Sequence, residues 1–202
     1  DVPDENNPLN IDHLMNIALT KKVLDIKKIQ KQKIPFYIKV YDLKDKKIKY
    51  LDAKKETLNK LKYSASVVPY YVTKNQRYID GDILEHLNIE YLLKKYPKEK
   101  IVAVINHKSK EKIGLRTKIK TRIEALMAET MYPKNNLKKY YITKENKIKK
   151  EIEIASNSPR TLLLLPPEES PTEILTTDPK KLKKTYRLGK KEANKIIKFI
   201  KN

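Results

Sequence analysis

The chain has 202 residues, of which 46 are Lys or Arg and 25 are Asp or Glu, so its formal net charge is +21. Hydrophobic residues make up 39% of the chain, which is enough for a folded core and argues against wholesale disorder. The absence of cysteine excludes disulfides, thiol catalysis and Cys-ligated metal sites.

The first third of the chain predicts short helices and a hairpin. Apolar residues recur at helical spacing over residues 11–18, and a second short helical pattern covers residues 23–26. Apolar and polar residues alternate over residues 34–41, and residues 48–51 return as a second strand. Residues 57–62 then predict a short helix.

The middle of the chain predicts a strand, a helix and a second strand. Residues 72–80 contain a polar turn at 74–76 and end as a strand, and residues 84–96 have helical spacing up to a proline that ends the helix. Residues 101–105 are a continuous, largely β-branched apolar run, which is typical of a strand covered on both faces in a parallel sheet. This order predicts one βαβ unit.

The last part of the chain predicts helices around one further strand. Residues 115–126 have the pattern of an amphipathic helix, and residues 137–152 that of a longer, highly charged one. Residues 161–165 are a second candidate for a buried strand. A capping Asp followed by Pro predicts a helix from 178 to Gly189, and residues 193–200 predict the last helix. The chain as a whole therefore predicts an α/β fold.

Glycine is scarce, which excludes several catalytic and binding motifs. The three glycines are Gly81, Gly114 and Gly189. A P-loop, a Rossmann fingerprint and a G-x-S-x-G nucleophile elbow each need several closely spaced glycines, so none of them is present.

The positive charge has three interpretations. Only five of the 46 basic residues are Arg, whose planar group suits base-edge and bidentate phosphate recognition, and acidic residues are interspersed among the lysines. A solvated Lys-rich surface is the simplest interpretation. Attraction to an anionic membrane surface is the second. A non-enzymatic module that binds polyanions or nucleic acid is the third.

The segment 78–82, with the letters Y-I-D-G-D, is the best candidate for a chemical site. A strand ends, Asp80 follows, and Gly81 permits a sharp turn. Loops beyond strand ends are where α/β folds place reacting groups. The alternative is that Asp80 only makes a turn with Gly81 or caps the following helix.

The surroundings of Asp80 resemble the patatin-like phospholipases. In that family an A-S-x-x-x-P-like segment precedes a strand that ends in D-G-G or D-G-A; here residues 64–69 read S-A-S-V-V-P and Asp82 replaces the last Gly or Ala. Residues 34–43 look like the family's strand that ends in T-D-L, and residues 161–167 with 186–193 look like the C-terminal extension of its bacterial subgroup. The resemblance covers most of residues 10–198.

The resemblance implies a function, a fold and a division of the chain. In this family the Asp of the D-G motif, here Asp80, is half of a Ser–Asp catalytic dyad, and Gly81 supports its turn. The implied fold is part of a three-layer α/β/α sheet with a helix-rich C-terminal extension. Residues 1–110 would form the second half of the catalytic domain, and residues 111–202 the extension, packed on the same domain.

The family's nucleophile is not found in this sequence. Patatin-like enzymes carry a glycine-rich oxyanion segment and a G-x-S-x-G elbow in their N-terminal half, and none of the chain's serines lies between glycines. We therefore expect the chain to be the second half of a serine lipid acyl hydrolase, a phospholipase or esterase, and to be inactive alone. We expect a cytoplasmic enzyme that acts on lipid esters, contacts anionic membranes at their surface and needs no cofactor or metal.

Other candidate residues are weaker. His86 lies six positions after Asp80, so a histidine-containing triad is conceivable, although an exposed helix position explains it as well. Asp80 and Asp82 could bind a hard cation such as Ca²⁺, but two carboxylates are few ligands. Four tyrosines could stack on bases or simply pack at the surface: Tyr70, Tyr71, Tyr140 and Tyr141.

Overall fold

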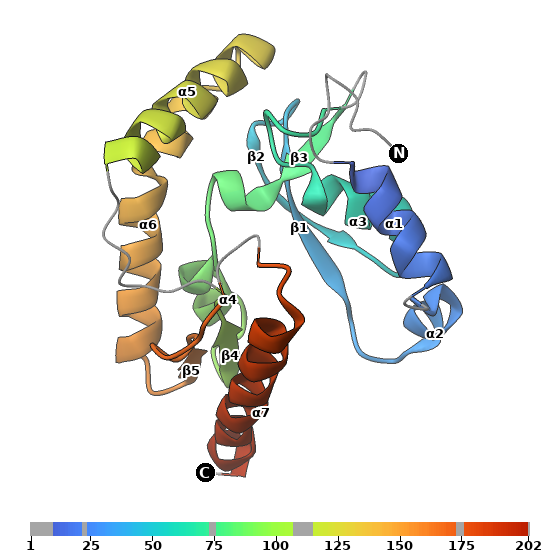
Figure 1. The fold of residues 1–202 in the computed structure, drawn as a ribbon, viewed down its shortest axis with the longest axis vertical. Helices are drawn as coiled ribbons and strands as arrows, with labels where there is room; N and C mark the ends of the chain where they lie inside the picture. Colours follow the sequence, from blue (N-terminus) through green and yellow to red (C-terminus); the bar gives the residue numbers. More distant parts are fainter. Residues whose placement is uncertain (1–9, 22–23, 73–75, 107–114, 173–175, 202) are drawn as a thin grey trace. The chain divides into compact units, whose positions relative to one another are not determined.

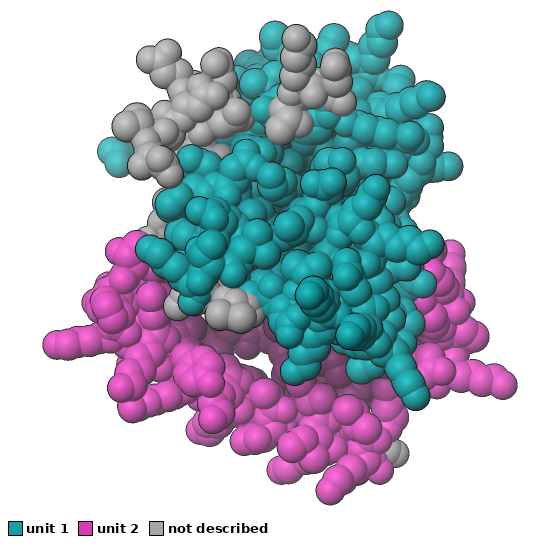
Figure 2. All heavy atoms as spheres, turned by 90° about the vertical axis from the view of Figure 1, so that its right-hand side faces the viewer, with its two compact units in different colours: residues 1–86, 115–144 teal, residues 87–114, 145–202 magenta. Residues whose placement is uncertain are grey.

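A computed structural model describes residues 10–21, 24–72, 76–106, 115–172 and 176–201, and it has the predicted mixture of helices and strands (Figure 1). The chain divides into two compact units (Figure 2). Unit 1 comprises residues 1–86 and 115–144, and unit 2 comprises residues 87–114 and 145–202. The domain boundary expected at residue 110 is not tested by this division and stays a prediction.

The sheet of unit 1 is antiparallel and has the order β2-β1-β3. Strand β1 (Tyr37–Asp42) pairs with β2 (Lys47–Asp52), so the predicted hairpin is confirmed. Strand β3 (Tyr78–Asp80) pairs with the other edge of β1, with Val40 opposite Asp80. The candidate acid is therefore at the end of an edge strand.

Helices cover both faces of this sheet. On one face, Ile38 and Val40 of β1 pack against Leu61 and Tyr63 of α3 (Thr57–Ala65). Helices α1 (Ile11–Thr20) and α2 (Ile26–Lys31) precede this sheet, and Asn10 and Asp25 cap their first turns.

The other face of the sheet carries the larger cluster. Tyr41 and Ile79 pack there against Ala128 of α5 (Leu115–Met131) and Leu137 of α6 (Leu137–Asn157). The residues that alternate along β1 thus enter two different clusters, which is what strand geometry requires of a sheet covered on both sides.

Helix α5 forms as predicted, but its apolar stripe is not part of the core. The buried residues of α5 are Ala125 and Ala128, whereas its large apolar side chains are 41–75% exposed. The small alanines let the helix approach its neighbours closely, so the sheet is covered by the side of α5 opposite the stripe. The exposed set is Leu115, Ile119, Ile123, Leu126, Met127 and Met131.

The sheet of unit 2 has two parallel strands, β4 (Ile101–Val104) and β5 (Thr161–Leu164). The predicted βαβ unit is wrong, because β3 pairs with β1 and β4 pairs with β5 in a different sheet. The prediction that β4 is buried on both faces is also wrong, since Val104 is 65% exposed.

The helix expected over residues 84–96 is interrupted. A short 3₁₀ turn, η1 (Gly81–Ile83), follows β3, and α4 (Ile89–Lys95) begins only after Asn88, whose φ is +55°. In unit 2, the backbone N–H of Leu87 donates to the buried carboxylate of Glu151 at 2.9 Å, and that of Asn88 donates to the same carboxylate. This tertiary anchor stabilises a turn where the apolar spacing predicts continuous helix.

The two C-terminal helices predicted from the sequence are one helix, α7 (Pro179–Lys201). Asp178 accepts a hydrogen bond from the N–H of Lys180 at 2.8 Å and Pro179 occupies the first turn, as predicted. Gly189 does not end the helix, because its φ is not positive and the helical pattern continues on both sides. The polar turn expected at residues 74–76 lies mostly outside the described residues.

Candidate functional site

Asp80 is the last residue of β3. Hydrogen bonds of its backbone and its side chain connect β3 to the segment 64–69 and to the turn that follows. Its N–H donates to the carbonyl oxygen of Ser66 at 3.0 Å, which places the segment 64–69 beside the end of β3. Its Oδ1 accepts a hydrogen bond from the N–H of Asp82 at 2.9 Å. Asp80 therefore makes the turn contact that the simpler interpretation expected, and this contact uses one of its two carboxylate oxygens.

Gly81 is required for a close approach rather than for an unusual backbone angle. Its φ is not positive. A Cβ atom at this position would lie 2.8 Å from Cγ of Lys39 and 3.0 Å from the backbone carbonyl carbon of the same residue. Gly81 thus lets the turn after Asp80 lie directly against β1.

The environment of Asp80 favours its protonated form more than water does. Burial raises the pKa of Asp80 to about 6, and the nearby Asp82 carboxylate acts in the same direction. The N–H of Asp82 and the ammonium groups of Lys144 and Lys39 lower the pKa, but by less. Among the residues that the structure describes, Asp80 forms no ion pair, so its carboxylate can act as a base close to neutral pH.

The environment of Asp82, by contrast, favours its ionised form. Burial acts to raise its pKa, but a hydrogen bond to His86 and the charge of Lys39 outweigh it and lower the pKa of Asp82 to about 2. Its two oxygens lie 2.8 Å from Nζ of Lys39 and 3.1 Å from Nδ1 of His86. The structure therefore pairs His86 with Asp82, whose contacts are nitrogen groups of Lys39 and His86 rather than further oxygen ligands.

Lys39 organises this end of the sheet, and it is not a candidate in the sequence pattern. Besides contacting Asp82, its ammonium group donates to the carbonyl oxygen of His86 at 2.6 Å and to that of Glu85. It thereby fixes the turn that follows Asp80. The only signal in the sequence is a Lys at a strand position whose neighbours Ile38 and Val40 are both apolar.

Hydrogen bonds attach the segment 64–69 to helices α3 and α6. The hydroxyl of Ser66 is buried and donates to the carbonyl oxygen of Lys62 at 2.7 Å, so Ser66 closes α3. The hydroxyl of Tyr141 donates to the carbonyl oxygen of Val68. Burial raises the pKa of Tyr141, and the charge of Asp80 contributes to this rise.

The other tyrosines considered as a stacking platform have packing and hydrogen-bonding roles. Tyr70 donates to Glu124, and Tyr71 donates to Asp12 at 3.0 Å. The ring of Tyr140 packs edge-on against that of Tyr41, with centroids 6.0 Å apart.

Asp42, in the segment that resembles the T-D-L strand, has a structural role. It is fully buried at the end of β1, where it accepts hydrogen bonds from the N–H groups of Lys44 and Asp45. It also pairs with Lys49 at 2.7 Å and Arg77 at 3.0 Å. Burial opposes ionisation, yet these partners together hold the pKa of Asp42 well below its usual range.

Comparisons of the chain with protein-family models, with curated proteins and with solved structures found no match. The likeness to the patatin-like family therefore rests on the sequence motifs. Of the helices that the structure describes, none is long and apolar enough to cross a bilayer.

Proposed function

We propose that this chain supplies the acid of a Ser–Asp dyad in a patatin-like hydrolase of lipid esters, with Asp80 as that acid. The observation that carries the proposal is the state of Asp80: a carboxylate at the tip of an edge strand, outside any ion pair formed by the described residues, with a pKa raised to about 6. Its neighbour Asp82, by contrast, is held by Lys39 and His86.

A raised pKa is what a dyad without histidine needs. An ordinary Asp carboxylate is a weak base at neutral pH, and burial strengthens it. In the proposed reaction Asp80 takes the proton of the serine hydroxyl, and the serine oxygen bonds to the ester carbonyl carbon. The carbon–oxygen bond to the alcohol then breaks, and the alcohol leaves with the proton. In the second half, Asp80 accepts a proton from water as the water oxygen bonds to the acyl carbon. The bond between that carbon and the serine oxygen then breaks, and the serine takes the proton back from Asp80.

The serine and the oxyanion donors would come from an N-terminal half that precedes these residues in the full-length enzyme. The order of the segment 64–69, β3 and the D-G turn supports this arrangement, because the hydrogen bond from Asp80 to Ser66 joins the two motifs on which the resemblance depends.

The test is hydrolysis of a short-chain nitrophenyl ester by the full-length enzyme. Asp80→Asn should lower kcat/KM by about 100-fold or more, which is the usual contribution of a general base. Asp52→Asn, which also changes an Asp at a strand end of the same sheet, should leave kcat/KM unchanged. In the parent enzyme, kcat/KM should fall as the pH drops through about 6, because the protonated carboxyl cannot accept a proton. Full activity of Asp80→Asn would refute the assignment.

A further inference from the structure

Helix α7 has an inner side that attaches it to unit 2. At about 3.6 residues per turn, its partly buried residues recur along one line of the helix, and α7 packs there against β5. These residues are Thr185, Leu188, Glu192, Ile196 and Phe199.

Hydrogen bonds at both ends fix the rotation of α7 about its axis. Near its start, the hydroxyl of Thr185 lies 3.0 Å from that of Thr172 and 3.3 Å from that of Ser170. Near its end, Nζ of Lys100 donates to the carbonyl oxygens of Phe199 at 2.9 Å and Ile200 at 3.2 Å. The remaining surface of α7 therefore faces outward in a defined orientation.

A line of apolar side chains runs along this outward surface. We call it the α7 stripe, and its large members are 47–67% exposed. Gly189 and Ala193 lie on the same line and keep it free of charge. Single exposed apolar residues are ordinary, but a continuous line of them marks an interaction surface. The large members are Leu182, Tyr186, Ile197 and Ile200.

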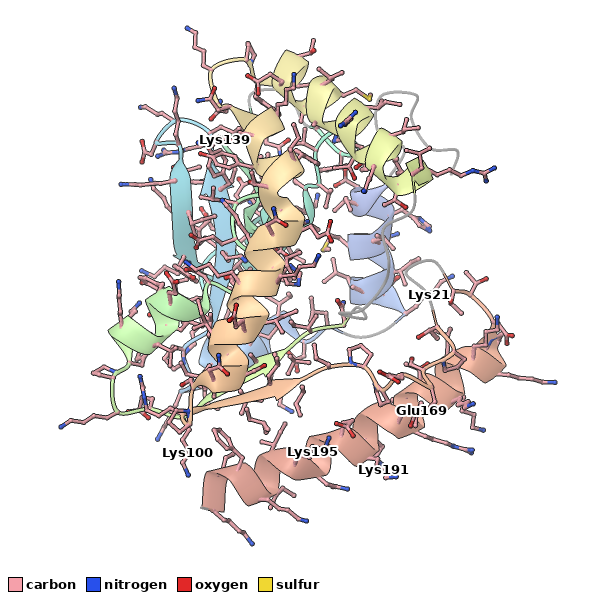
Figure 3. The ribbon with its side chains drawn as sticks, turned by 90° about the vertical axis from the view of Figure 1, so that its left-hand side faces the viewer. Lys21, Lys100, Lys139, Glu169, Lys191 and Lys195 are labelled. Carbon is pink, nitrogen blue, oxygen red and sulfur yellow. The ribbon has the colours of Figure 1, made fainter. Side chains whose placement is uncertain are left out.

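Cations border the α7 stripe on the side away from β5. The 23 residues of α7 include ten Lys or Arg and a single acid, Glu192. By helical geometry Lys183, Arg187 and Lys190 lie next to the stripe, and the ammonium group of Lys190 is 6.0 Å from the centroid of the Tyr186 ring. Further lysines, Lys191 and Lys195 among them, occupy the rest of the outward surface (Figure 3).

We propose that α7 docks this chain on the surface of an anionic lipid bilayer. The α7 stripe would enter the boundary between headgroups and acyl chains, and the bordering cations would contact lipid phosphates. A nucleic acid would use the same cations, but it offers no partner to the three aliphatic members of the stripe, and α7 contains only one Arg. This inference does not rest on the proposed hydrolase activity, because membrane docking needs neither Asp80 nor a nucleophile.

A tryptophan reporter tests which side of α7 meets the lipid. The chain contains no Trp, so a single introduced Trp gives an unmixed fluorescence signal. Ile197→Trp places the reporter on the α7 stripe, and Lys191→Trp places it opposite the middle of the stripe. With phosphatidylcholine vesicles that contain phosphatidylglycerol, emission of Ile197→Trp should shift to the blue and that of Lys191→Trp should not. Equal shifts for the two variants, or no shift for either, would overturn the proposal.

Co-sedimentation with the same vesicles tests the two contributions separately. The stripe variant Leu182→Ser/Ile197→Ser/Ile200→Ser should bind at least about tenfold more weakly than the parent. The charge variant Lys183→Gln/Arg187→Gln/Lys190→Gln should lose a similar factor at low salt. Pure phosphatidylcholine vesicles should bind the parent weakly.

Matched controls change the same residue types elsewhere. Ile34→Ser/Val104→Ser/Ile142→Ser removes three exposed apolar side chains outside α7, and Lys27→Gln/Lys31→Gln/Lys33→Gln removes three exposed charges; both should bind vesicles like the parent. Three results would contradict membrane docking: undiminished vesicle binding by the stripe variant, conversion of a parent oligomer to a monomer by that variant, or tight binding to duplex DNA without binding to vesicles.

Discussion

The carboxylates of Asp80, at the end of β3, and of Asp82, in the turn that follows, are two residues apart and yet have pKa values shifted in opposite directions. Asp80 is partly buried and forms no ion pair among the described residues, and its pKa is raised to about 6. Asp82 contacts Lys39 and His86, and its pKa is lowered to about 2. The anionic form of Asp80 is thus destabilised by its surroundings, whereas that of Asp82 is stabilised by the groups that hold the turn.

This contrast predicts opposite effects of the same substitution on stability. An Asp in the unfolded chain ionises near 3.8, whereas folded Asp80 keeps its proton up to about 6, so ionisation of Asp80 lowers the free energy of unfolding as the pH rises between these values. Asp80→Asn removes this penalty and should raise the free energy of unfolding above pH 6 by at most about 3 kcal/mol, with little gain below pH 4.

Asp82→Asn is the matched comparison for Asp80→Asn. The folded pKa of Asp82 is depressed, so its contribution to stability is present above about 3.8 and is lost as the pH falls toward 2. The substitution should therefore destabilise the protein at neutral pH. Urea unfolding of both variants and the parent at several pH values measures the two effects, and changes of the same sign at neutral pH would disprove this account of the turn.

At the scale of elements, Gly81 and Gly189 place different requirements on the backbone. Gly81 lies against Lys39, where a Cβ atom has no room. Gly189 lies within α7, and a Cβ atom there would meet nothing within 4 Å. Glycine inside a helix is costly because the unfolded chain loses more conformational freedom on folding.

The two glycines therefore predict opposite outcomes for replacement by Ala. Gly189→Ala should raise the free energy of unfolding by about 0.5–1 kcal/mol. Gly81→Ala should lower it by about 1–3 kcal/mol, because the turn must move away from the backbone of β1. Thermal or urea unfolding monitored by far-ultraviolet circular dichroism checks both, and a destabilised Gly189→Ala would contradict the continuity of α7.

Helix α5 shows how an element can be predicted correctly while its packing is not. Its apolar spacing predicts a core-facing stripe, but the side in contact with the sheet of unit 1 is the one with Ala125 and Ala128. Amphipathic spacing predicts which side chains share a helix face, but it does not predict which face packs against the rest of the protein.

At the scale of the whole molecule, the proposed hydrolase needs residues that this sequence does not contain. The chain has no serine between glycines and hence no recognisable nucleophile elbow. We therefore expect residues 1–202 alone to show no turnover of a nitrophenyl ester and no labelling by a fluorophosphonate. Serine-dependent hydrolysis by this chain would contradict the proposal that it supplies only the acid.

The sequence by itself determined the local features of the protein. The alternation in residues 34–51 specified the β1–β2 hairpin, Asp178 and Pro179 specified the start of α7, and the D-G pair located a polar group at a strand end. These features depend on side-chain periodicity and on backbone preferences within a few residues, so they can be predicted without knowledge of the fold.

Only the tertiary structure decided the strand pairings and the electrostatics of the candidate site. The partner of β3 is β1 from about 40 residues earlier, and the turn at Asn88 depends on Glu151 from more than 60 residues later. Likewise, the pKa of Asp80 is raised because distant segments partly bury its carboxyl and form no ion pair with it among the described residues. Burial and charge pairing depend on which residues are neighbours in space, and local sequence patterns do not specify those neighbours.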